Sequence, residues 1–503
     1  MFPRAVFAHY MVGLTLNQTV SQWQHDIISA KNASIDGFAL NIGPGDHFTL
    51  DELHDAYSVA AEVGNFSLFL SFDFAAAGGP AGHAWNVSSV AGLIGEFKGE
   101  DAQYLVDGKP LVSTFEGTAF VDDWDAVRKE VDGGIYFVPD WSSMGPEGVG
   151  RVRDRIDGHF SFDAWPKPGQ QSMTTVVDKA YQAALDGKTY MMGVSPYFYT
   201  NLHGLSKNWY ATSTTLWYDR LEQMLSLEPA PDMVQIISWN DFGESHYISD
   251  IVHTQVYPDA GHYIHGMDHS AFRTLLPYYI AAYKSGKKSI PLLDDMGDGI
   301  AVAWYRTTPN LGHCGDGGAV WGQGGTQSAK EGLEDSINVV VITGKKKAVL
   351  TVSVGGEKRE FVVSRRRREL VKVMLSEFKG LGEVKIGLNG REEEGPPITE
   401  VCPETGALNL NVVAVDVVAP WTEGGEEEED GDEDVQEEGG GGGSGPGSST
   451  GGSGGNTSGG LEIGTPSWAA VLSVVAFHFS WAIFDRLDQL YQKPGNSRHL
   501  RYE

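Results

Sequence analysis

Eight short apolar segments, each followed by a stretch of helical character, fill the first 290 residues of the chain. Strands that alternate with helices over this length predict a (β/α)8 TIM barrel. A doubly wound sheet would normally carry a Gly-rich phosphate turn after its first strand, and no such turn follows residues 5–10. The predicted strands are residues 5–10, 37–42, 67–72, 109–114, 134–139, 158–162, 190–194 and 233–238, and the predicted helices include 19–31, 50–63, 172–185, 214–227 and 271–284.

After residue 290 the pattern changes to the two-residue alternation of half-buried strands, with turn residues between them. This alternation predicts a β-sandwich-like domain over residues 291–420. Basic residues 345–347 and 365–368 lie near its predicted turns and edges, where we expect them to stay in solvent and block edge pairing. The predicted strands are residues 301–305, 337–343, 348–354, 360–363, 371–374, 382–388 and 408–418.

The last part of the chain does not resemble a folded domain. Residues 423–438 carry eleven acidic side chains and no basic one, and a Gly/Ser tract follows, so we expect residues 421–466 to form a disordered linker. Within residues 467–503, an apolar stretch from Trp468 to Phe484 is 17 residues long, the lower limit for a membrane-spanning helix. A membrane anchor, a surface-binding amphipathic helix and a spurious gene-model tail remain open interpretations of this segment.

The formal net charge of −30 argues against a nucleic-acid partner, because binding to phosphates needs a basic face.

For the two cysteines, Cys314 and Cys402, one disulfide and two free thiols remain equally open. Five N-x-S/T sequons favour a secretory route. The first residues lack the signal-peptide pattern, so we expect either an intracellular protein or a sequence whose natural start is missing. The sequons begin at Asn17, Asn32, Asn65, Asn86 and Asn456.

Polar and aromatic side chains follow the carboxyl end of every predicted barrel strand, which is where barrels of this type place their active sites. Any one of them could merely cap the next helix. Carboxylates interleaved with Trp and Tyr together predict a site for a neutral sugar, because aromatic rings stack on sugar faces while carboxylates bind hydroxyls and catalyse glycosidic cleavage. The residues are His9, Asn41, Asp73, Glu116, Asp140, Trp141, Asp163, Trp165, Tyr197, Trp239, Asn240, Asp241 and Glu244.

At these positions the sequence resembles a known family. The segments VFAHYMVG, DGFALNIG, LFLSFDF, KPLVSTFEG, FVPDW, FDAWP, YMMGVSPYFYTN and SWNDFGES look like those of the fungal α-1,3-glucanases (mutanases) of glycoside hydrolase family 71. The resemblance covers residues 4–310 in order and continues more loosely beyond. It implies a catalytic barrel with a β-sandwich-like companion that cleaves cell-wall α-1,3-glucan with inversion, outside the cell or at its wall. The linker, the apolar tail and the missing signal peptide depart from the family pattern.

The resemblance carries the catalytic pair onto Asp241 and Glu244 of the WNDFGE segment. We assign Glu244 as general acid and Asp241 as general base, with the reverse left open. The other strand-end residues, His9, Asn41, Asp73, Glu116, Asp140, Asp163, Trp165, Tyr197, Trp239 and Asn240, are predicted to bind substrate. We expect a monomer without cofactor or metal, including at the neighbouring His262, His265 and His269. The alternatives are an inactive glucan-binding wall protein and a hydrolase of another α-glucan.

Overall fold

The computed structural model describes residues 4–75, 84–290, 299–310, 313–403 and 405–419. The predicted linker, the apolar segment 468–484 and the sequon at Asn456 lie outside these ranges. Within the described ranges, no helix is long and apolar enough to cross a membrane.

All eight predicted barrel strands are present and pair in parallel, in the order β5-β3-β2-β1-β11-β8-β7, with β6 beside β5. Backbone hydrogen bonds from Asp157 N–H to Phe137 O and from Phe160 N–H to Pro139 O, both 2.9 Å, join β6 to β7 and close the sheet into a barrel-like ring. Nearly every strand residue is buried, as expected for a sheet covered on both faces. The strands are β1 (Ala5–Met11), β2 (Gly37–Ile42), β3 (Ser67–Asp73), β5 (Lys109–Phe115), β6 (Tyr136–Phe137), β7 (Gly158–Ser161), β8 (Thr189–Val194) and β11 (Met233–Ile236); a short strand, β4 (Leu105–Val106), pairs antiparallel with β5.

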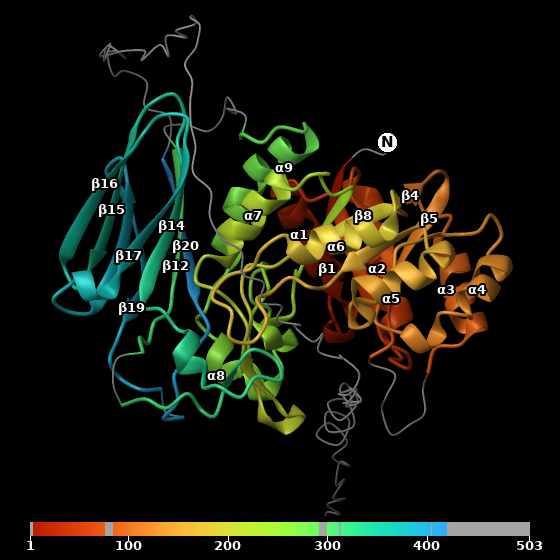
Figure 1. The fold of residues 1–503 in the computed structure, drawn as a ribbon, viewed down its shortest axis with the longest axis horizontal. Helices are drawn as coiled ribbons and strands as arrows, with labels where there is room; N and C mark the ends of the chain where they lie inside the picture. Colours follow the sequence, from red (N-terminus) through yellow and green to blue (C-terminus); the bar gives the residue numbers. More distant parts are fainter. Residues whose placement is uncertain (1–3, 76–83, 291–298, 311–312, 404, 420–503) are drawn as a thin grey trace, which may run out of the picture. The chain divides into compact units, whose positions relative to one another are not determined.

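Helices between the strands pack their apolar faces on this sheet (Figure 1). The first begins with a capping box, in which Thr19 and Gln22 bond each other's backbone N–H groups. The predicted helix 271–284 is wrong in its first half: Ser270–Leu275 is a 3-10 helix, and the α-helix restarts with Pro277 in its first turn, where a missing N–H costs no hydrogen bond. The helices are α1 (Val20–Asn32), α2 (Thr49–Val63), α3 (Val87–Phe97), α4 (Trp124–Glu130), α5 (Gly145–Val152), α6 (Val176–Leu185), α7 (Leu216–Ser226), α8 (Gly261–Ile264) and α9 (Leu276–Lys284).

A small antiparallel hairpin that the sequence pattern did not predict follows β8. It consists of β9 (Tyr199–Leu202) and β10 (Lys207–Tyr210), and β13 (Val320–Trp321) extends it in parallel with β10. The hairpin therefore connects the carboxyl end of the barrel to the later, β-rich part of the chain.

The β-rich part forms two four-stranded sheets that share one apolar core. The strand β19 was not predicted, because its sequence REEEGPPI has no apolar alternation and contains two prolines; it lies at a sheet edge, where proline is tolerated. The predicted strand 408–418 begins only at Val413. One sheet contains β17 (Arg368–Met374), β14 (Ser336–Ile342), β12 (Gly299–Tyr305) and β20 (Val413–Ala419), and the other contains β16 (Glu357–Val363), β15 (Ala348–Val354), β18 (Gly382–Leu388) and β19 (Arg391–Ile398).

The barrel and the β-rich part are connected by specific polar contacts. Trp304 donates from Nε1 to Thr214 O at 2.7 Å, and the Arg368 guanidinium bonds the Glu222 carboxylate.

Of the two possibilities for the cysteines, the structure shows the disulfide. It joins Cys314 to Cys402 and closes a loop spanning 88 residues.

Candidate active site

The turn after β11 brings several polar side chains together. Asp241 precedes a 3-10 helix, Phe242–Glu244, and its backbone N–H donates to Ser238 Oγ at 2.9 Å. The same hydroxyl lies 2.9 Å from His246 Nδ1, and Ser238 N–H donates to His246 O at 2.7 Å. Ser238 therefore fixes both ends of the turn that carries Asp241, Glu244 and His246.

Glu244 is surrounded by hydrogen-bond donors. Lys207 Nζ donates to its Oε1 at 2.8 Å, and His246 Nε2 lies 3.0 Å from its Oε2. Burial alone would raise the pKa of Glu244, but Lys207 and His246 together hold that pKa well below its usual range. Glu244 is therefore a carboxylate that stays ionised in the resting site.

Asp241 has the opposite electrostatic environment. Its pKa is raised, first by burial and then by the negative charge of Glu244, with His246 and Lys207 opposing. One carboxyl oxygen of Asp241, one of Glu244 and one ring nitrogen of His246 all lie within 4.8 Å of one another. The two environments push the pKa values of the carboxyl groups apart, that of Asp241 upward and that of Glu244 downward, which is the pattern found in acid and base pairs.

The spacing of this pair bears on the expected stereochemistry. Inverting glycosidases separate their two carboxyl groups by roughly 6.5–9.5 Å to leave room for a water molecule. The nearest oxygens of Asp241 and Glu244 are closer than that in this structure. An inverting reaction by this pair therefore requires the two groups to move apart when substrate enters.

An aromatic wall adjoins the carboxylates. The Trp165 ring lies 5.4 Å from the His246 ring at an interplanar angle of 33°, and Phe198 packs against Trp165 with centroids 4.8 Å apart. Trp209 of β10 stacks on Phe198 with centroids 6.2 Å apart and an angle of 9°. Trp209 is two residues from Lys207 on the same strand, so both side chains leave one face of the hairpin.

A second group of carboxylates follows β5, β6 and β7. Ser143 donates to Glu116 through both its backbone N–H and its hydroxyl, and Ser142 N–H donates to Asp140 at 2.9 Å. Burial raises the pKa of both carboxyls, and for Asp140 the charge of Glu116 adds to the effect. Asp163 accepts from Tyr181 Oη at 3.2 Å and pairs with Lys167.

Three predicted residues occupy the first three strands. His9 is buried with Nδ1 2.9 Å from Gln235 Nε2, and burial, aided by the charge of His246, lowers its pKa to about 3. Asn41 is buried and its Nδ2 has no hydrogen-bond partner among the described residues. Asp73 accepts from Ala75 N–H at 2.9 Å. Burial would lower the pKa of Lys207, but Glu244, with smaller contributions from Asp241 and Asp73, raises it above its usual value.

Other predicted substrate ligands lie in the protein interior. Trp239 and Tyr197 are 0% and 2% exposed, and Trp141 is likewise enclosed. Tyr197 Oη donates to Leu410 O at 2.8 Å, and the Asn240 amide accepts from Met11 N–H at 2.8 Å. Tyr197, Trp239 and Trp141 present no ring face to a ligand in this arrangement, and Asn240 joins the ends of β1 and β11.

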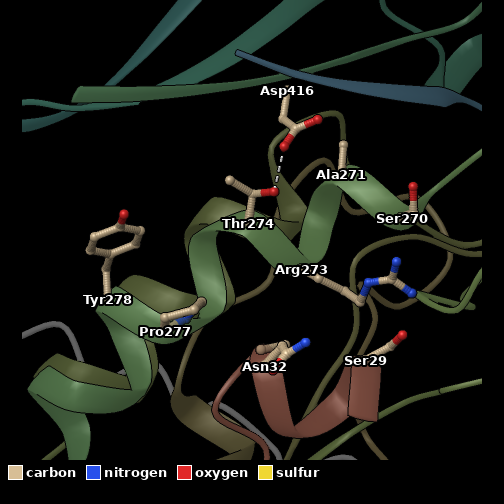
Figure 2. A pocket seen from close by; sticks show the side chains of 10 residues that line it. Ser29, Asn32, Ser270, Ala271, Arg273, Thr274, Pro277, Tyr278 and Asp416 are labelled. Atoms are coloured by element: carbon tan, nitrogen blue, oxygen red, sulfur yellow. Dashed lines mark hydrogen bonds between the residues drawn. The ribbon is translucent and has the colours of Figure 1, made fainter. Parts of the chain in front are cut away.

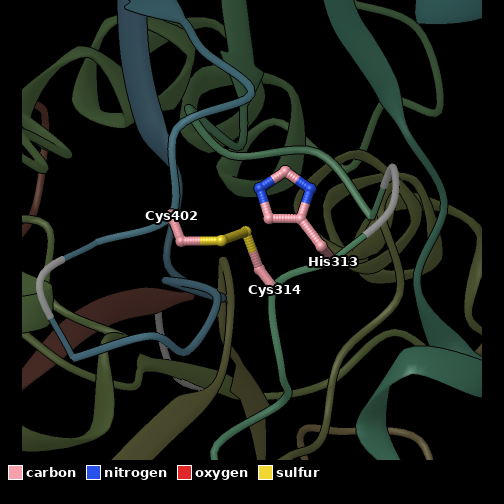
Figure 3. A group of neighbouring side chains, drawn as sticks. All are labelled: His313, Cys314 and Cys402. Atoms are coloured by element: carbon pink, nitrogen blue, oxygen red, sulfur yellow. A yellow bond between two sulfur atoms is a disulfide. The ribbon is translucent and has the colours of Figure 1, made fainter.

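Two groups of side chains have the spacing of possible metal ligands among the described residues. Asp241, Glu244 and His246 could hold a cation, although the Lys207 ammonium on Glu244 opposes one. His313 lies beside Cys314 and Cys402, but Figure 3 shows both sulfurs joined in the disulfide, so no thiolate is available. The histidines 262, 265 and 269 contact different partners: Asn201, His253 and the carbonyls of Tyr247 and Val412.

Comparison with known proteins identifies the lineage of this site. The family model described as Glycosyl hydrolase family 71 matches residues 3–424. The chain belongs to glycosyl hydrolase family 71. It is 38% identical over 348 residues to a mutanase of Penicillium rubens, covering 67% of this chain and 72% of that protein. It is 37% identical over 373 residues to the glucan endo-1,3-α-glucosidase of Schizosaccharomyces pombe, covering 71% and 82%.

Among solved structures, the GH99 endo-α-mannosidase of Bacteroides thetaiotaomicron matches 57% of this chain and 99% of its own at 12% identity, with a TM-score of 0.44. The prediction of family 71, made from the ordered motifs, is confirmed by the family match.

Sequence reasoning missed four residues of this candidate site: Ser238, His246, Lys207 and Trp209. Ser238 and His246 flank the WNDFGE segment, so the adjacency of a hydroxyl and an imidazole to two carboxylates could have identified them. Lys207 and Trp209 lie on the unpredicted hairpin, more than thirty positions before Glu244. Their place in the site follows from tertiary structure, and no local motif marks it.

Proposed function

We propose that the chain hydrolyses α-1,3-glucosidic bonds of glucan through an acid/base pair formed by Asp241 and Glu244. The observation that carries the proposal is the opposed electrostatic environments of these two carboxyl groups at the end of β11, in a chain of glycosyl hydrolase family 71. The names of the two relatives, a mutanase and a glucan endo-1,3-α-glucosidase, support α-1,3-glucan as the substrate.

The direction of the pKa shifts favours Asp241 as the acid and Glu244 as the base, the reverse of the assignment we first preferred. Asp241 would donate its proton to the glycosidic oxygen as the bond to the anomeric carbon breaks. Glu244, held ionised by Lys207, would take a proton from the water that attacks the anomeric carbon from the opposite face. This sequence inverts the configuration, provided that the two carboxyl groups move apart to admit the water when substrate enters. Each turnover transfers the proton gained by Glu244 back through solvent to Asp241.

The surroundings supply sugar-binding groups of the required kinds. Trp165 and Trp209, both half-exposed, offer ring faces for stacking, and they replace the buried Trp239 and Tyr197 in this role. The carboxylates of Asp73, Glu116 and Asp163 and the Nδ2 of Asn41, which has no partner among the described residues, would bind hydroxyls. Asp140 is fully buried, and the charge of Glu116 adds to burial in raising its pKa, so we do not assign Asp140 to substrate binding.

The test is hydrolysis of insoluble α-1,3-glucan, assayed by reducing ends, with Asp241→Asn, Glu244→Gln and the surface control Glu62→Gln. We expect each site variant to lose about 10²–10⁴-fold in activity, and the control to lose none. An α-glucosyl fluoride needs no protonation of its leaving group, so Asp241→Asn should retain activity on it. Azide is a nucleophile that needs no general base, so it should restore turnover to Glu244→Gln.

Each other outcome identifies an alternative. Retained activity of Glu244→Gln on the fluoride would reverse the two roles, and NMR detection of the α-anomer first would overturn inversion. Wild-type binding without hydrolysis would make the protein an inactive glucan-binding protein. Equal or faster cleavage of an α-1,4 polymer would make it a hydrolase of another α-glucan.

We propose that the protein works outside the cell or at its wall. The Cys314–Cys402 disulfide supports this location, because disulfides persist in oxidising compartments, and the sequons agree with it. We assign catalysis to residues 1–290 and a supporting role to residues 291–420, and we expect a monomer, which light scattering of the purified chain would test.

A further inference from the structure

A surface cleft lies outside the proposed active site, between the barrel helices and the β-rich part. Its volume is about 440 Å³, within the range of roughly 300–1,000 Å³ typical of ligand pockets. One wall is the end of α1 with Ser29 and Asn32, the opposite wall is the segment from Ser270 to Tyr278, and Asp416 of β20 closes the top of the cleft in Figure 2.

One lining residue is itself a point of covalent attachment. Asn32 begins the sequon Asn32-Ala33-Ser34, and it is exposed as the last residue of α1. Its side chain makes no hydrogen bond to any residue in the described ranges, and Figure 2 shows its amide directed toward the interior of the cleft. A sugar linked to this amide nitrogen would start inside the cleft.

The other lining groups suit a neutral sugar. Arg273 uses two of its five N–H groups, on Ile248 O at 3.2 Å and Asp250 Oδ1 at 2.8 Å, which leaves donors for hydroxyl or acetamido oxygens. Asp416 accepts from Thr274 Oγ1 at 2.6 Å through one oxygen and keeps a second to accept from hydroxyls. The half-buried ring of Tyr278 adds apolar surface.

We infer that Asn32 carries an N-linked glycan whose first sugars occupy this cleft and bridge α1, α9 and β20. This inference rests on the export proposed above and is independent of the glucanase reaction. The sequons at Asn17 and Asn65 differ in setting: both asparagines are exposed and have positive φ values of 65° and 51°, and neither lines this cleft. Glycans on those two residues would extend into solvent.

The experiment is to secrete the full chain from a yeast host behind a secretion leader and measure glycan release by peptide-N-glycosidase, site by site, with mass spectrometry. We expect the Asn32 glycan to be released at least about tenfold more slowly from the native chain than from the denatured chain, equivalent to about 1.4 kcal/mol of sugar contacts. Glycans at Asn17 or Asn65 should be released from the native chain without such a delay.

Two kinds of variant sharpen the result. Tyr278→Ala opens one wall of the cleft and should speed native release at Asn32 alone. Asn32→Gln and Ser34→Ala remove the sequon through different residues, so equal drops in melting temperature for both would come from loss of the glycan. Hydrolysis of a soluble α-1,3-gluco-oligosaccharide should be unchanged in all three variants.

Occupancy of Asn17 or Asn65 without Asn32 would overturn the inference and leave export intact. Equal release of the Asn32 glycan from native and denatured chains would also overturn it, because a sugar held in the cleft must be protected. Failure of the glucanase assay would affect neither outcome, since both are measured by mass.

Discussion

Replacing Lys207 by Met should move the acid limb of the activity profile to higher pH. Lys207 Nζ lies 2.8 Å from Glu244 Oε1, and the two side chains are 26% and 18% exposed. Methionine keeps much of the length and apolar volume of the lysine stem and removes its charge. The pKa of Glu244, which Lys207 and His246 hold below its usual value against the effect of burial, should therefore rise.

The size of the shift follows from the contact. At 2.8 Å and an effective dielectric constant of about 20, Coulomb's law gives an upper bound of about 6 kcal/mol. Measured effects of an opposite charge at such range are about 1–3 pKa units. His246 remains 3.0 Å from the other oxygen of Glu244, so we expect the lower part of that range, about 1–2 units.

The direction of the shift in the acid limb depends on which ionisation state of Glu244 is active. If Glu244 is the base, activity requires its ionised form, so activity is lost as pH falls through its pKa. A higher pKa in Lys207→Met moves that loss upward by about 1–2 pH units. The assay is kcat/KM on a soluble α-1,3-gluco-oligosaccharide, from the lowest pH at which both proteins stay folded up to about pH 8, since this ratio reports the ionisation of the free enzyme.

Two controls make the result specific. Lys207→Arg keeps the cation and should keep the acid limb close to that of the wild type. Lys179→Met removes a charge from the exposed face of α6 and should change nothing. An acid limb in Lys207→Met that coincides with the wild-type limb, in a folded and active variant, would show that Lys207 does not tune the base and would refute the reasoning.

Three further predictions concern neighbouring features. Trp209→Ala should raise KM for the oligosaccharide by about 2–10-fold with little change in kcat, because it removes one stacking face; steady-state kinetics check this, and an unchanged KM contradicts it. Tyr197→Phe should lower the free energy of unfolding by about 1–3 kcal/mol, since Leu410 O loses its buried donor, and leave KM unaltered; urea titration and kinetics separate this from a sugar-binding role. Replacing Cys314 and Cys402 together by Ser should cost about 2–4 kcal/mol for the loop of 88 residues, and an unchanged denaturation midpoint would contradict that estimate.

The barrel strands could be predicted because each is a continuous apolar run, buried on both faces and followed by a helix. The same reasoning placed Asp241 and Glu244 at the carboxyl rim, since they follow β11. Their catalytic roles came from the resemblance to family 71 and stay a prediction. Whether an aromatic side chain at that rim packs into the core or borders the site could not be predicted in this way. Trp239 and Trp165 both follow strands, yet the ring of one packs in the core against Phe38 while that of the other borders the site.

The hairpin β9–β10 escaped prediction for a related reason. Its residues have no strong apolar alternation, and besides pairing with β9, strand β10 pairs with β13, more than a hundred residues later. Lys207 therefore reaches Glu244 through contacts that no local pattern encodes. The edge strand β19 shows the same limit, because it is held by β18 and not by its own composition.

Contacts from the β-rich part also support the turn that carries Asp241 and Glu244, and the family-71 match likewise continues past the barrel to residue 424. Tyr263 Oη donates to Gly243 O at 2.7 Å, inside the turn that separates Asp241 from Glu244. The carbonyl of the same Tyr263 accepts from Asn411 Nδ2 at 3.1 Å, just before β20. The hairpin that carries Lys207 is held in turn by Asn208, whose Nδ2 donates to Gly317 O at 2.9 Å. The turn between Asp241 and Glu244 and the hairpin that carries Lys207 are thus both hydrogen-bonded, directly or through Tyr263, to the β-rich part. The geometry of the carboxylate pair therefore depends on residues far outside the barrel.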